Sequence, residues 1–398
     1  MLRSPCLRAA CGAVLLVSLS ASAFGAPEPK FRTLVVDPRI GVGSDLAIAD
    51  VDGDGKLDIL IADKQALVWY RNPDWTRINI AGKLSDYEHI TISAAAEKGG
   101  SGRLERLAVT DGKPWDPTAT NGKSFYLTPP PDRTQPWTAT ALPLDATAHR
   151  SQWWFAGDGS LALMEVPLHG LNNKDGAGEG MKLALCRTSD PVVGKWSPQS
   201  IQTSLHLSHS FIPENDGGAP GRFLIGCKEG VAEFTPETGD VKLIVTAERD
   251  GSQGAGEVGC GHLPGGRRFI ATVEPMHGTQ VVVYAEKPDH SWERKVVDGT
   301  LTDAHALVVG DLLGVGSDQV VAGSRQANAA GKFGVNFYAP PGDSGDWRKT
   351  SVDENDMACE RLALADLNGD GKLDIIAAGR ATKNVKVYFN ETPVVEKP

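Results

Sequence analysis

Beyond its first 23 residues the chain contains no apolar run that approaches the roughly 18 residues needed for a transmembrane helix. It also lacks any long segment with helical periodicity, which favours an all-β protein. Basic residues are fewer than acidic ones: the chain has 40 Lys and Arg and 50 Asp and Glu, for a net charge of −10. We therefore expect neither membrane insertion nor a nucleic-acid or anionic-membrane partner.

The first 23 residues have the pattern of a secretory signal peptide. Arg3 and Arg8 precede the apolar run GAVLLVSL, and Ala21-Ser22-Ala23 supplies small residues for cleavage. We expect residues 1–23 to be removed, leaving a periplasmic or secreted protein of residues 24–398 with a net charge of −12. No Pro/Ser linker interrupts that stretch, so we expect a single domain.

The cysteines form no CxxC pair. Two lie in the expected signal peptide, and the mature chain keeps Cys186, Cys227, Cys260 and Cys359 at wide spacing. One or two disulfides in an exported protein and buried free thiols are both compatible with this spacing.

Two nearly identical segments lie at opposite ends of the chain. DLAIADVDGDGKLDILIAD begins at Asp45, and RLALADLNGDGKLDIIAAG begins at Arg361. The first loop aspartates, Asp50 and Asp366, are 316 residues apart, which divides into six steps of about 53 residues, close to the length of a large propeller blade. Six steps imply seven blades.

The sequence thus predicts an all-β, seven-bladed β-propeller. Blade one is expected from about Gly43, and further blades from near Glu88, His149, His209, Glu257 and His305, before the final copy. In a propeller the first strand of each blade lines the axis. Residues that open these strands should therefore face one another across the ring, however far apart they are in sequence.

The two copied loops carry oxygen-bearing side chains at alternate positions, with glycines that permit a tight turn. This pattern suits a hard cation, and we predict structural calcium in each loop. The expected ligands are Asp50, Asp52, Asp54, Asp58 and the carbonyl of Lys56, and then Asp366, Asn368, Asp370, Asp374 and the carbonyl of Lys372. The related loop GDLLGVGSD has Leu313 and Val315 at ligand positions, and we expect no ion there.

Histidines recur at one position of the repeat. Six residues before the loop aspartate stand Glu360 in blade seven and His305 in blade six, and the same register gives His209, His149, His89 and, more loosely, Glu257. The whole chain has nine histidines. Imidazoles and carboxylates that converge on one pocket favour a divalent transition metal, zinc above all. Any one of them, taken alone, also fits a polar residue at a channel mouth.

The acidic loops and their LAIAD and LALAD strands resemble the FG-GAP or VCBS repeat of seven-bladed propellers. A second resemblance rests on EPMHGTQ, which contains His277, together with AHR, SHS and AHA around His149, His209 and His305. Over roughly residues 40–345 these motifs resemble the propeller domain of the aldos-2-ulose dehydratase family. That resemblance implies metal-dependent elimination of water from keto-sugars such as 1,5-anhydrofructose, with these four histidines in the active site.

The chain departs from that family in lacking the two cupin domains that follow the propeller, so we expect no isomerase step. We expect two or three of His209, His277 and His305, with Glu360, to hold the metal. His149 is the expected base for the α-proton, with His277 also catalytic, and Arg150 would stabilise the enediolate. Substrate contacts are expected from His89, Trp153, Trp154 and Glu257, although a Trp pair in a strand also fits packing between blades.

Two other functions remain open. One is a non-catalytic calcium-binding propeller that binds a glycan or a protein, and the other is a polysaccharide lyase. A lyase of uronates would need a basic cleft, and we expect few basic residues near the axial positions. The preferred function is a keto-sugar lyase that removes water or, from a 3-keto-glycoside, the glycosidic oxygen. We expect a small carbohydrate substrate and a monomer or small homo-oligomer.

Overall fold

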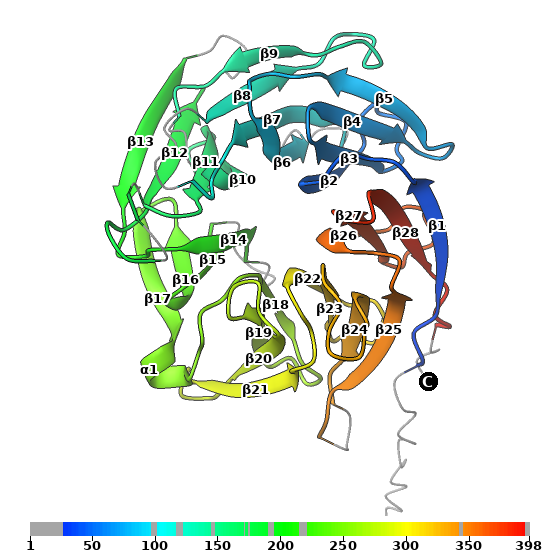
Figure 1. Cartoon of the computed structure of the whole chain (residues 1–398). Coiled ribbons are helices and arrows are strands. Elements are labelled where there is room, and N and C mark those ends of the chain that lie inside the picture. The colour runs from blue at the N-terminus through cyan, green and yellow to red at the C-terminus, as the bar shows by residue number, and fades with distance from the viewer. Residues whose placement is uncertain are drawn as a thin grey trace, which may run out of the picture.

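The computed structural model describes residues 27–96, 102–116, 122–144, 148–170, 172–173, 176–189, 195–214, 221–341 and 345–394. Seven four-stranded antiparallel sheets surround a central axis (Figure 1). This confirms the predicted all-β, seven-bladed β-propeller. The predicted signal peptide, residues 1–23, lies outside the described residues.

The strands fall into seven blades, each named by its place in the chain. Blade one comprises β2 (Asp45–Ala49), β3 (Asp58–Asp63), β4 (Ala66–Arg71) and β5 (Thr76–Ala81), and blade two β6 (Glu88–Ala96), β7 (Leu104–Gly112), β8 (Lys123–Thr128) and β9 (Thr138–Ala141). Blade three comprises β10 (Ala148–Phe155), β11 (Leu161–Pro167), β12 (Lys182–Thr188) and β13 (Trp196–Gln202), and blade four β14 (Ser208–Pro213), β15 (Phe223–Cys227), β16 (Gly230–Thr235) and β17 (Asp240–Thr246), followed by the short helix α1 (Ala247–Asp250). Blade five comprises β18 (Val258–His262), β19 (Arg268–Glu274), β20 (Gln280–Glu286) and β21 (Trp292–Asp298), and blade six β22 (Ala304–Gly310), β23 (Gln319–Ser324), β24 (Gly334–Ala339) and β25 (Arg348–Glu354).

Blade seven joins the two ends of the chain. Its strand order is β1 (Phe31–Asp37), β28 (Asn384–Asn390), β27 (Asp374–Gly379) and β26 (Cys359–Ala365). The N-terminal strand pairs antiparallel with the last strand of the sequence, Phe31 opposite Asn390. The ring is therefore closed by main-chain hydrogen bonds between residues from opposite ends of the fold. The sequence reading placed all seven inner strands but did not foresee this closing strand.

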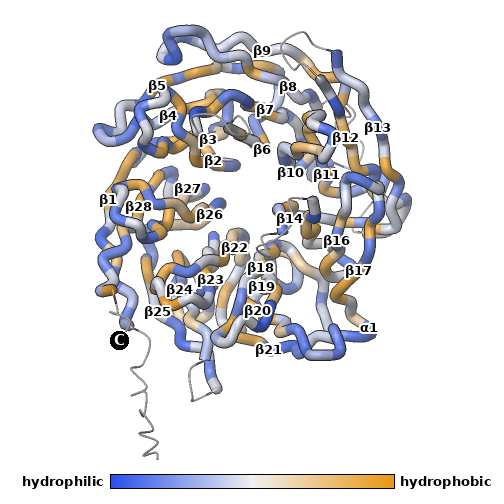
Figure 2. Tube along the Cα trace, turned by 180° about the vertical axis from the view of Figure 1, so that it is seen from behind, coloured by the Kyte–Doolittle hydropathy of each residue, from blue (hydrophilic) through white to orange (hydrophobic). Residues whose placement is uncertain are grey.

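The hydrophobic core lies between neighbouring blades. The second strands of blades one and seven, DILIAD and DIIAAG, are buried at every position. Ile59 and Ile61 belong to the same buried cluster as Ile376 and Val387 of the adjacent blade. Figure 2 shows hydrophobic residues running through the blades and hydrophilic residues gathered at loops and the outer rim. Each blade thus completes the core of its neighbours, which holds the axial strands in place.

An asparagine at the end of the third strand links neighbouring blades. The side-chain amide of Asn72 donates to the carbonyls of Leu57 and Leu367, at 3.0 and 2.7 Å. Asn390 donates in the same way to the carbonyls of Leu312 and Leu373, at 2.7 and 3.1 Å. Each amide bonds one carbonyl in the loop of its own blade and one in the loop of the neighbouring blade, so it links the two loops across a blade boundary.

Cys186, Cys227 and Cys359 are buried free thiols, which is one of the two states that the sequence left open. Within the described ranges, no helix has the length and apolar character needed to cross a membrane.

Candidate functional site

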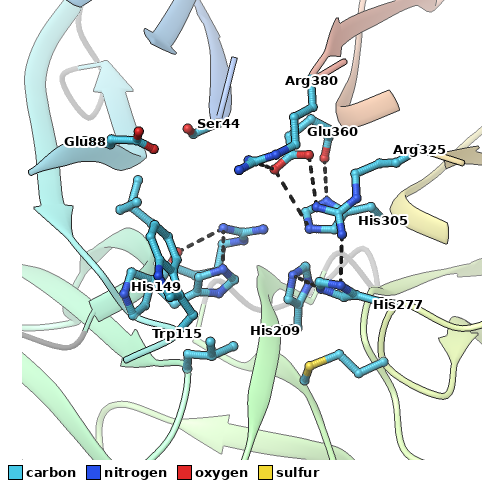
Figure 3. A pocket seen from close by; sticks show the side chains of 15 residues that line it. Ser44, Glu88, Trp115, His149, His209, His277, His305, Arg325, Glu360 and Arg380 are labelled. Atoms are coloured by element: carbon cyan, nitrogen blue, oxygen red, sulfur yellow. Dashed lines mark hydrogen bonds and ion pairs between the residues drawn. The ribbon is translucent and has the colours of Figure 1, made fainter. Parts of the chain in front are cut away.

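A cavity of about 180 Å³ opens on the axis of the ring. His149, His209, His277 and His305 line it together with Glu360 (Figure 3). These are the four histidines that the sequence motifs singled out, contributed by blades three, four, five and six. Histidines up to 156 positions apart in the chain therefore line one pocket.

β-Bulges aim the axial side chains. In β10 the pairing with β11 passes from Ala148 to Arg150 and leaves His149 as the extra residue. An extra residue bends its strand and redirects its side chain. The same shift occurs at the start of three more inner strands and leaves out His209, His305 and Glu360.

Three of the histidines form a compact triangle. The ring centroids of His209, His277 and His305 are each 4.6 Å from the other two. One nitrogen from each ring lies within 4.8 Å of the others. Three imidazoles in this arrangement are a donor set that zinc uses in catalytic sites, with the remaining coordination position left for water or substrate.

The outer ring nitrogens of two of these histidines are already bonded. Nδ1 of His209 donates to Oε1 of Glu257 at 2.8 Å, and Nδ1 of His305 donates to the carbonyl of Glu360 at 2.9 Å. Each bond leaves the Nε2 lone pair available. Carboxylates and carbonyls commonly orient metal-binding histidines in this way.

His277 sits in a strained backbone conformation, with φ of 54° in the left-handed region. For a residue with a bulky side chain, this conformation is unusual and often accompanies function. Nη2 of Arg325 donates to Nδ1 of His277 at 3.0 Å, and Nε2 of His277 lies 2.9 Å from Nε2 of His209. Because arginine can only donate, the proton of neutral His277 lies on Nε2 and points to His209.

Metal binding would therefore require a change at His277. Oδ1 of Asp303 lies 3.6 Å from Nδ1 of His277 and also accepts from Nη2 of Arg325 at 2.7 Å. If Arg325 moves away, the ring proton can shift to Nδ1 and be donated in a hydrogen bond to Asp303, which frees the Nε2 lone pair. With that adjustment the three imidazoles fit a divalent transition metal.

Burial keeps these imidazoles neutral. It lowers the pKa of His149, His209 and His305 well below 6.5, and nearby arginines act in the same direction on all three. Burial and then Arg325 lower the pKa of His277 to about 4. Neutral rings are the form that binds metals or accepts a proton, so all four are suited to either role at neutral pH.

His149 stands beside the triangle. Its ring centroid is 4.7 Å from that of His209. Nη1 of Arg150 lies 3.4 Å from its Nε2, and Nδ1 has no hydrogen-bond partner among the described residues. His149 and Arg150 thus place a neutral base and a cation next to each other in the pocket.

A buried ion-pair network lies next to the pocket. Arg361 of blade seven contacts Oδ1 of Asp45 at 2.7 Å and Oε2 of Glu257 at 3.3 Å. Oε1 of Glu257 lies 3.7 Å from Nη2 of Arg150 and accepts from His209. Burial raises the pKa of Glu257, while Arg361 and Arg150 act against the rise. The network joins five blades around the channel and holds the His209 ring in place.

Glu360 lines the pocket but is not grouped with the three histidines. Its Oε1 is 4.0 Å from Nε2 of His305, and its carboxylate contacts Nη1 of Arg380 at 3.1 Å and Nη1 of Arg325 at 3.3 Å. Glu360 as a metal ligand stays a prediction, and in this arrangement two guanidinium groups contact its carboxylate. Glu360 positions the two arginines and, through its carbonyl, His305.

Two of the predicted substrate contacts are displaced from the axis. In β6 the extra residue is Ile90, so His89 pairs in register with Asp111 and its ring turns into the blade. Its Nδ1 lies 2.5 Å from Oδ1 of Asp111, with both side chains fully buried. Glu257 has no bulge to redirect it and binds His209 instead of facing the cavity. A sequence signal existed: each correctly placed axial residue follows Ala, Ser or Cys, whereas His89 follows Glu88.

The predicted stacking of Trp153 or Trp154 on a sugar is also wrong. Trp153 is buried, donates from Nε1 to the carbonyl of Ser93 at 3.0 Å and packs edge-on against Tyr126. Trp154 lies in the hydrophobic cluster between blades three and four. The alternative of packing between blades is the correct one for both residues.

The sequence reading named Arg150 but missed two further arginines of the pocket, Arg325 and Arg380. Arg150, Arg325 and Arg380 line the pocket, so the expectation of few basic residues near the axis is wrong. The repeat pattern contains a signal for Arg325 and Arg380, because the residue directly after the second strand is basic in five blades, as Lys64, Lys113, Lys228, Arg325 and Arg380. Ser44 and Trp115 also line the pocket and were not foreseen.

The acidic loops are built almost identically in blades one and seven. The carboxylate of Asp50 accepts the amides of Gly53 and Gly55, as that of Asp366 accepts those of Gly369 and Gly371. In blade one, carboxylate oxygens of Asp50, Asp52 and Asp58 lie within 4.8 Å of one another.

The remaining predicted calcium ligands have the following contacts, and Asp374 is bonded as Asp58 is in blade one, where Asp58 accepts the amides of Val51 and Asn72. Asp54 is exposed and pairs with Nζ of its neighbour Lys56 at 3.1 Å. In blade seven, Asp374 is buried and accepts the amides of Leu367 and Asn390. Asn368, Asp370 and Lys372 belong to the same loop, where the Lys372 amide donates to Asp370 at 3.0 Å. The arrangement in blade one is compatible with a cation, and calcium remains a prediction for both loops.

No protein-family model matches the chain, and no curated protein is significantly similar to it. Solved structures share the fold. A chain of the mitotic checkpoint complex has a TM-score of 0.56 at 13% identity, covering 94% of this chain and 99% of that one. The BBS1N–ARL6DN complex gives a TM-score of 0.54 at 11% identity, covering 94% and 100%.

An extracellular domain of the putative one-component system BT4673 from B. thetaiotaomicron gives a TM-score of 0.53 at 11% identity, covering 90% of this chain and 40% of that one. At these identities the likeness concerns the propeller fold alone.

Proposed function

We propose that this protein is a metal-dependent carbon–oxygen lyase acting on keto-sugars. The observation that carries the proposal is the triangle of His209, His277 and His305, with centroids 4.6 Å apart and neutral rings, beside a fourth neutral imidazole. A pore lined only for solvation has no need of four imidazoles in one cavity, three of them redirected by β-bulges. The sequence resemblance to the propeller of the aldos-2-ulose dehydratase family points to the same chemistry and the same histidines.

In this proposal His209, His277 and His305 hold a divalent transition metal such as zinc. The bound metal would act as a Lewis acid that makes the hydrogen α to the substrate carbonyl more acidic. His149 accepts that proton, since its neutral ring lines the pocket beside the triangle. Arg150, adjacent to His149, stabilises the negative charge that develops on the substrate oxygens.

The two glutamates near the pocket hold other side chains in position. Glu257 fixes the His209 ring, and Glu360 holds Arg325 and Arg380 at the pocket edge. Loss of the β-oxygen completes the elimination: the C–H and C–O bonds break, a carbon–carbon double bond forms, and water or an alcohol leaves with a proton. We further propose that calcium bound in the Asp50–Asp58 and Asp366–Asp374 loops stabilises the blades, and that the protein acts in the periplasm or outside the cell.

A second candidate gains support from Arg150, Arg325 and Arg380. A polysaccharide lyase removes the proton α to a uronate carboxylate, and guanidinium groups are well suited to bind that carboxylate. Two of the three are already paired with Glu360, which leaves less free positive charge than the count suggests. The keto-sugar reaction therefore remains the preferred function.

The test begins with elemental analysis of the purified protein. We expect one transition metal per chain, removable by chelation, in addition to calcium. The protein is then incubated with 1,5-anhydrofructose, 3-keto-glucosides and a polyuronate while the ultraviolet absorbance of an enone or unsaturated uronate is recorded. Enone from a keto-sugar supports the proposal, and product from the polyuronate alone would replace it with the second candidate. Calcium as the sole metal, with no product, would favour a binding module.

A further inference from the structure

Trp115 is an exposed aromatic side chain at the edge of the axial pocket. It is 55% exposed, and the other strongly exposed large hydrophobic residues that the structure describes are all valines. Exposing an indole of this size to water is unfavourable, and such residues commonly mark a binding surface. Trp115 lines the axial cavity beside Pro114, so this binding surface belongs to the cavity.

Trp115 is carried by blade two on the turn that follows β7. The amide of Asp116 donates to the carbonyl of Lys113 at 3.0 Å, which closes the turn. The Lys113 ammonium lies over the ring of Tyr87, 5.6 Å from its centroid. The indole is therefore attached to a turn with its own contacts to the blade.

The cavity has room for about one sugar ring. Its 180 Å³ corresponds to about six water molecules at ~30 Å³ each, which is comparable to a single hexose. Figure 3 shows Trp115 and Glu88 on the side of the pocket opposite His277 and Arg325. A ring that reaches the three histidines fills the cavity, so Trp115 contacts whatever projects beyond that ring.

We infer that the substrate is a keto-glycoside with a second ring, and that Trp115 stacks on this leaving ring. The inference rests on the proposed function and chooses between the free anhydro-keto-sugar and the glycoside. In a 3-keto-glycoside, the hydrogen on C2 is α to the carbonyl and the glycosidic oxygen on C1 is β to it. Elimination breaks the C2–H and C1–O bonds, forms the C1–C2 double bond and releases the second ring as an alcohol. No oxidant or reductant is needed.

The test uses Trp115→Ala and Trp115→Phe, with Val296→Ala as a control on the outer strand β21. Three substrates are compared: a 3-keto-disaccharide, the methyl 3-keto-glucoside and 1,5-anhydrofructose. For the wild type, kcat/KM should be at least tenfold higher with the disaccharide than with the methyl glycoside, a difference of about 1.4 kcal/mol. Trp115→Ala should reduce this ratio to near one, mainly through KM, and Trp115→Phe should restore part of it.

A binding measurement separates this inference from the proposed function. Calorimetry with the unoxidised disaccharide, which cannot react, should show at least tenfold weaker binding for Trp115→Ala, whereas Val296→Ala should bind like the wild type. Equal disaccharide binding by Trp115→Ala and the wild type would overturn the inference, even if the protein turns over 1,5-anhydrofructose. Absence of product from every keto-sugar would instead overturn the proposed function.

Discussion

The acidic loops and the axial histidines are both candidate metal sites, but they are assembled in opposite ways. In the blade-one loop the carboxylates of Asp50, Asp52 and Asp58 lie within nine residues of one another, and backbone amides of the same loop hold Asp50 in place. The axial triangle takes one histidine from each of three blades. The loop is a local structure repeated in two blades, whereas the axial site exists only when the ring has closed.

The two sites differ in which contacts hold their ligand side chains in place. A loop carboxylate is oriented by its own turn, so its geometry follows from a short sequence motif. An axial imidazole is oriented by a bulge, by a partner in another blade and by the packing between blades. Sites of the second kind should be more sensitive to single substitutions of partners that are remote in sequence.

The largest effect is expected from His209→Ala. Loss of one imidazole should abolish axial metal binding and reduce keto-sugar elimination by at least about 10²–10³-fold, since electrostatic stabilisation of the transition state is lost. Elemental analysis and the enone assay measure both effects. His290→Ala, at an exposed histidine, is the control. Calcium content should not change, and an unchanged transition-metal content would refute the assignment of the triangle.

Asp366→Ala tests the opposite region. We expect the loss of one bound calcium per chain and a lower thermal midpoint in calcium, because an ion at 100 times its Kd contributes about 2.7 kcal/mol to the folded state. The difference from the wild type should shrink in chelator. Asp311→Ala in the blade-six loop, where Leu313 and Val315 replace ligands, is the matched control and should leave calcium content unchanged. The axial metal should be retained in both variants.

Glu257→Gln tests whether a remote partner tunes the axial site. Removing the charge that faces Nδ1 of His209 should weaken axial metal binding by about 10–100-fold, as for other residues that orient a metal ligand. Metal titration with a competing chelator gives the change in Kd. Glu229→Gln serves as the control, because it removes the charge from a comparable 2.7 Å contact to Nδ1 of His206 outside the pocket. Equal metal affinity in both variants would contradict a role for Glu257 at the metal site.

The smallest effect is expected from Asp63→Asn, because this carboxylate is satisfied without any ion. It accepts the amides of Gly41 and Val42 at 2.8 and 2.6 Å. Burial acts to raise its pKa, but these amide bonds outweigh burial and lower it below 3.8. Such a group stabilises the fold above pH 3.8, and the contribution is lost as the pH falls through its folded-state pKa.

At pH 7 the Asp63→Asn variant should lose about 1–3 kcal/mol of unfolding free energy, the usual cost of weakening hydrogen bonds to a buried charge. The loss should diminish below pH 3.8 and should not depend on calcium. Denaturant titrations of the wild type, Asp63→Asn and the exposed control Glu237→Gln at several pH values measure this. If the loss of unfolding free energy depended on calcium, Asp63 would instead contribute to the calcium-binding loops.

The repeat pattern predicted the fold and three of the four histidines that line the pocket. The spacing of Asp50 and Asp366 indicated seven blades, and the register from Glu360 and His305 led to His209 and His149. That register failed at His89, because the bulge in β6 falls one residue later and turns the ring into the blade. Sequence spacing alone does not specify which residue of an antiparallel ladder is left unpaired.

By itself, the sequence determined the number of blades, the two acidic loops and the axial positions of His149, His209 and His305, because these follow from short motifs repeated along the chain. Only the tertiary structure decided which groups meet at the axis. It removed His89, Trp153 and Trp154 from the pocket, assigned Glu360 to Arg325 and Arg380, and brought Trp115 to the rim. Those outcomes depend on bulges, ring closure and charge pairing between blades, which are contacts between residues distant in the sequence.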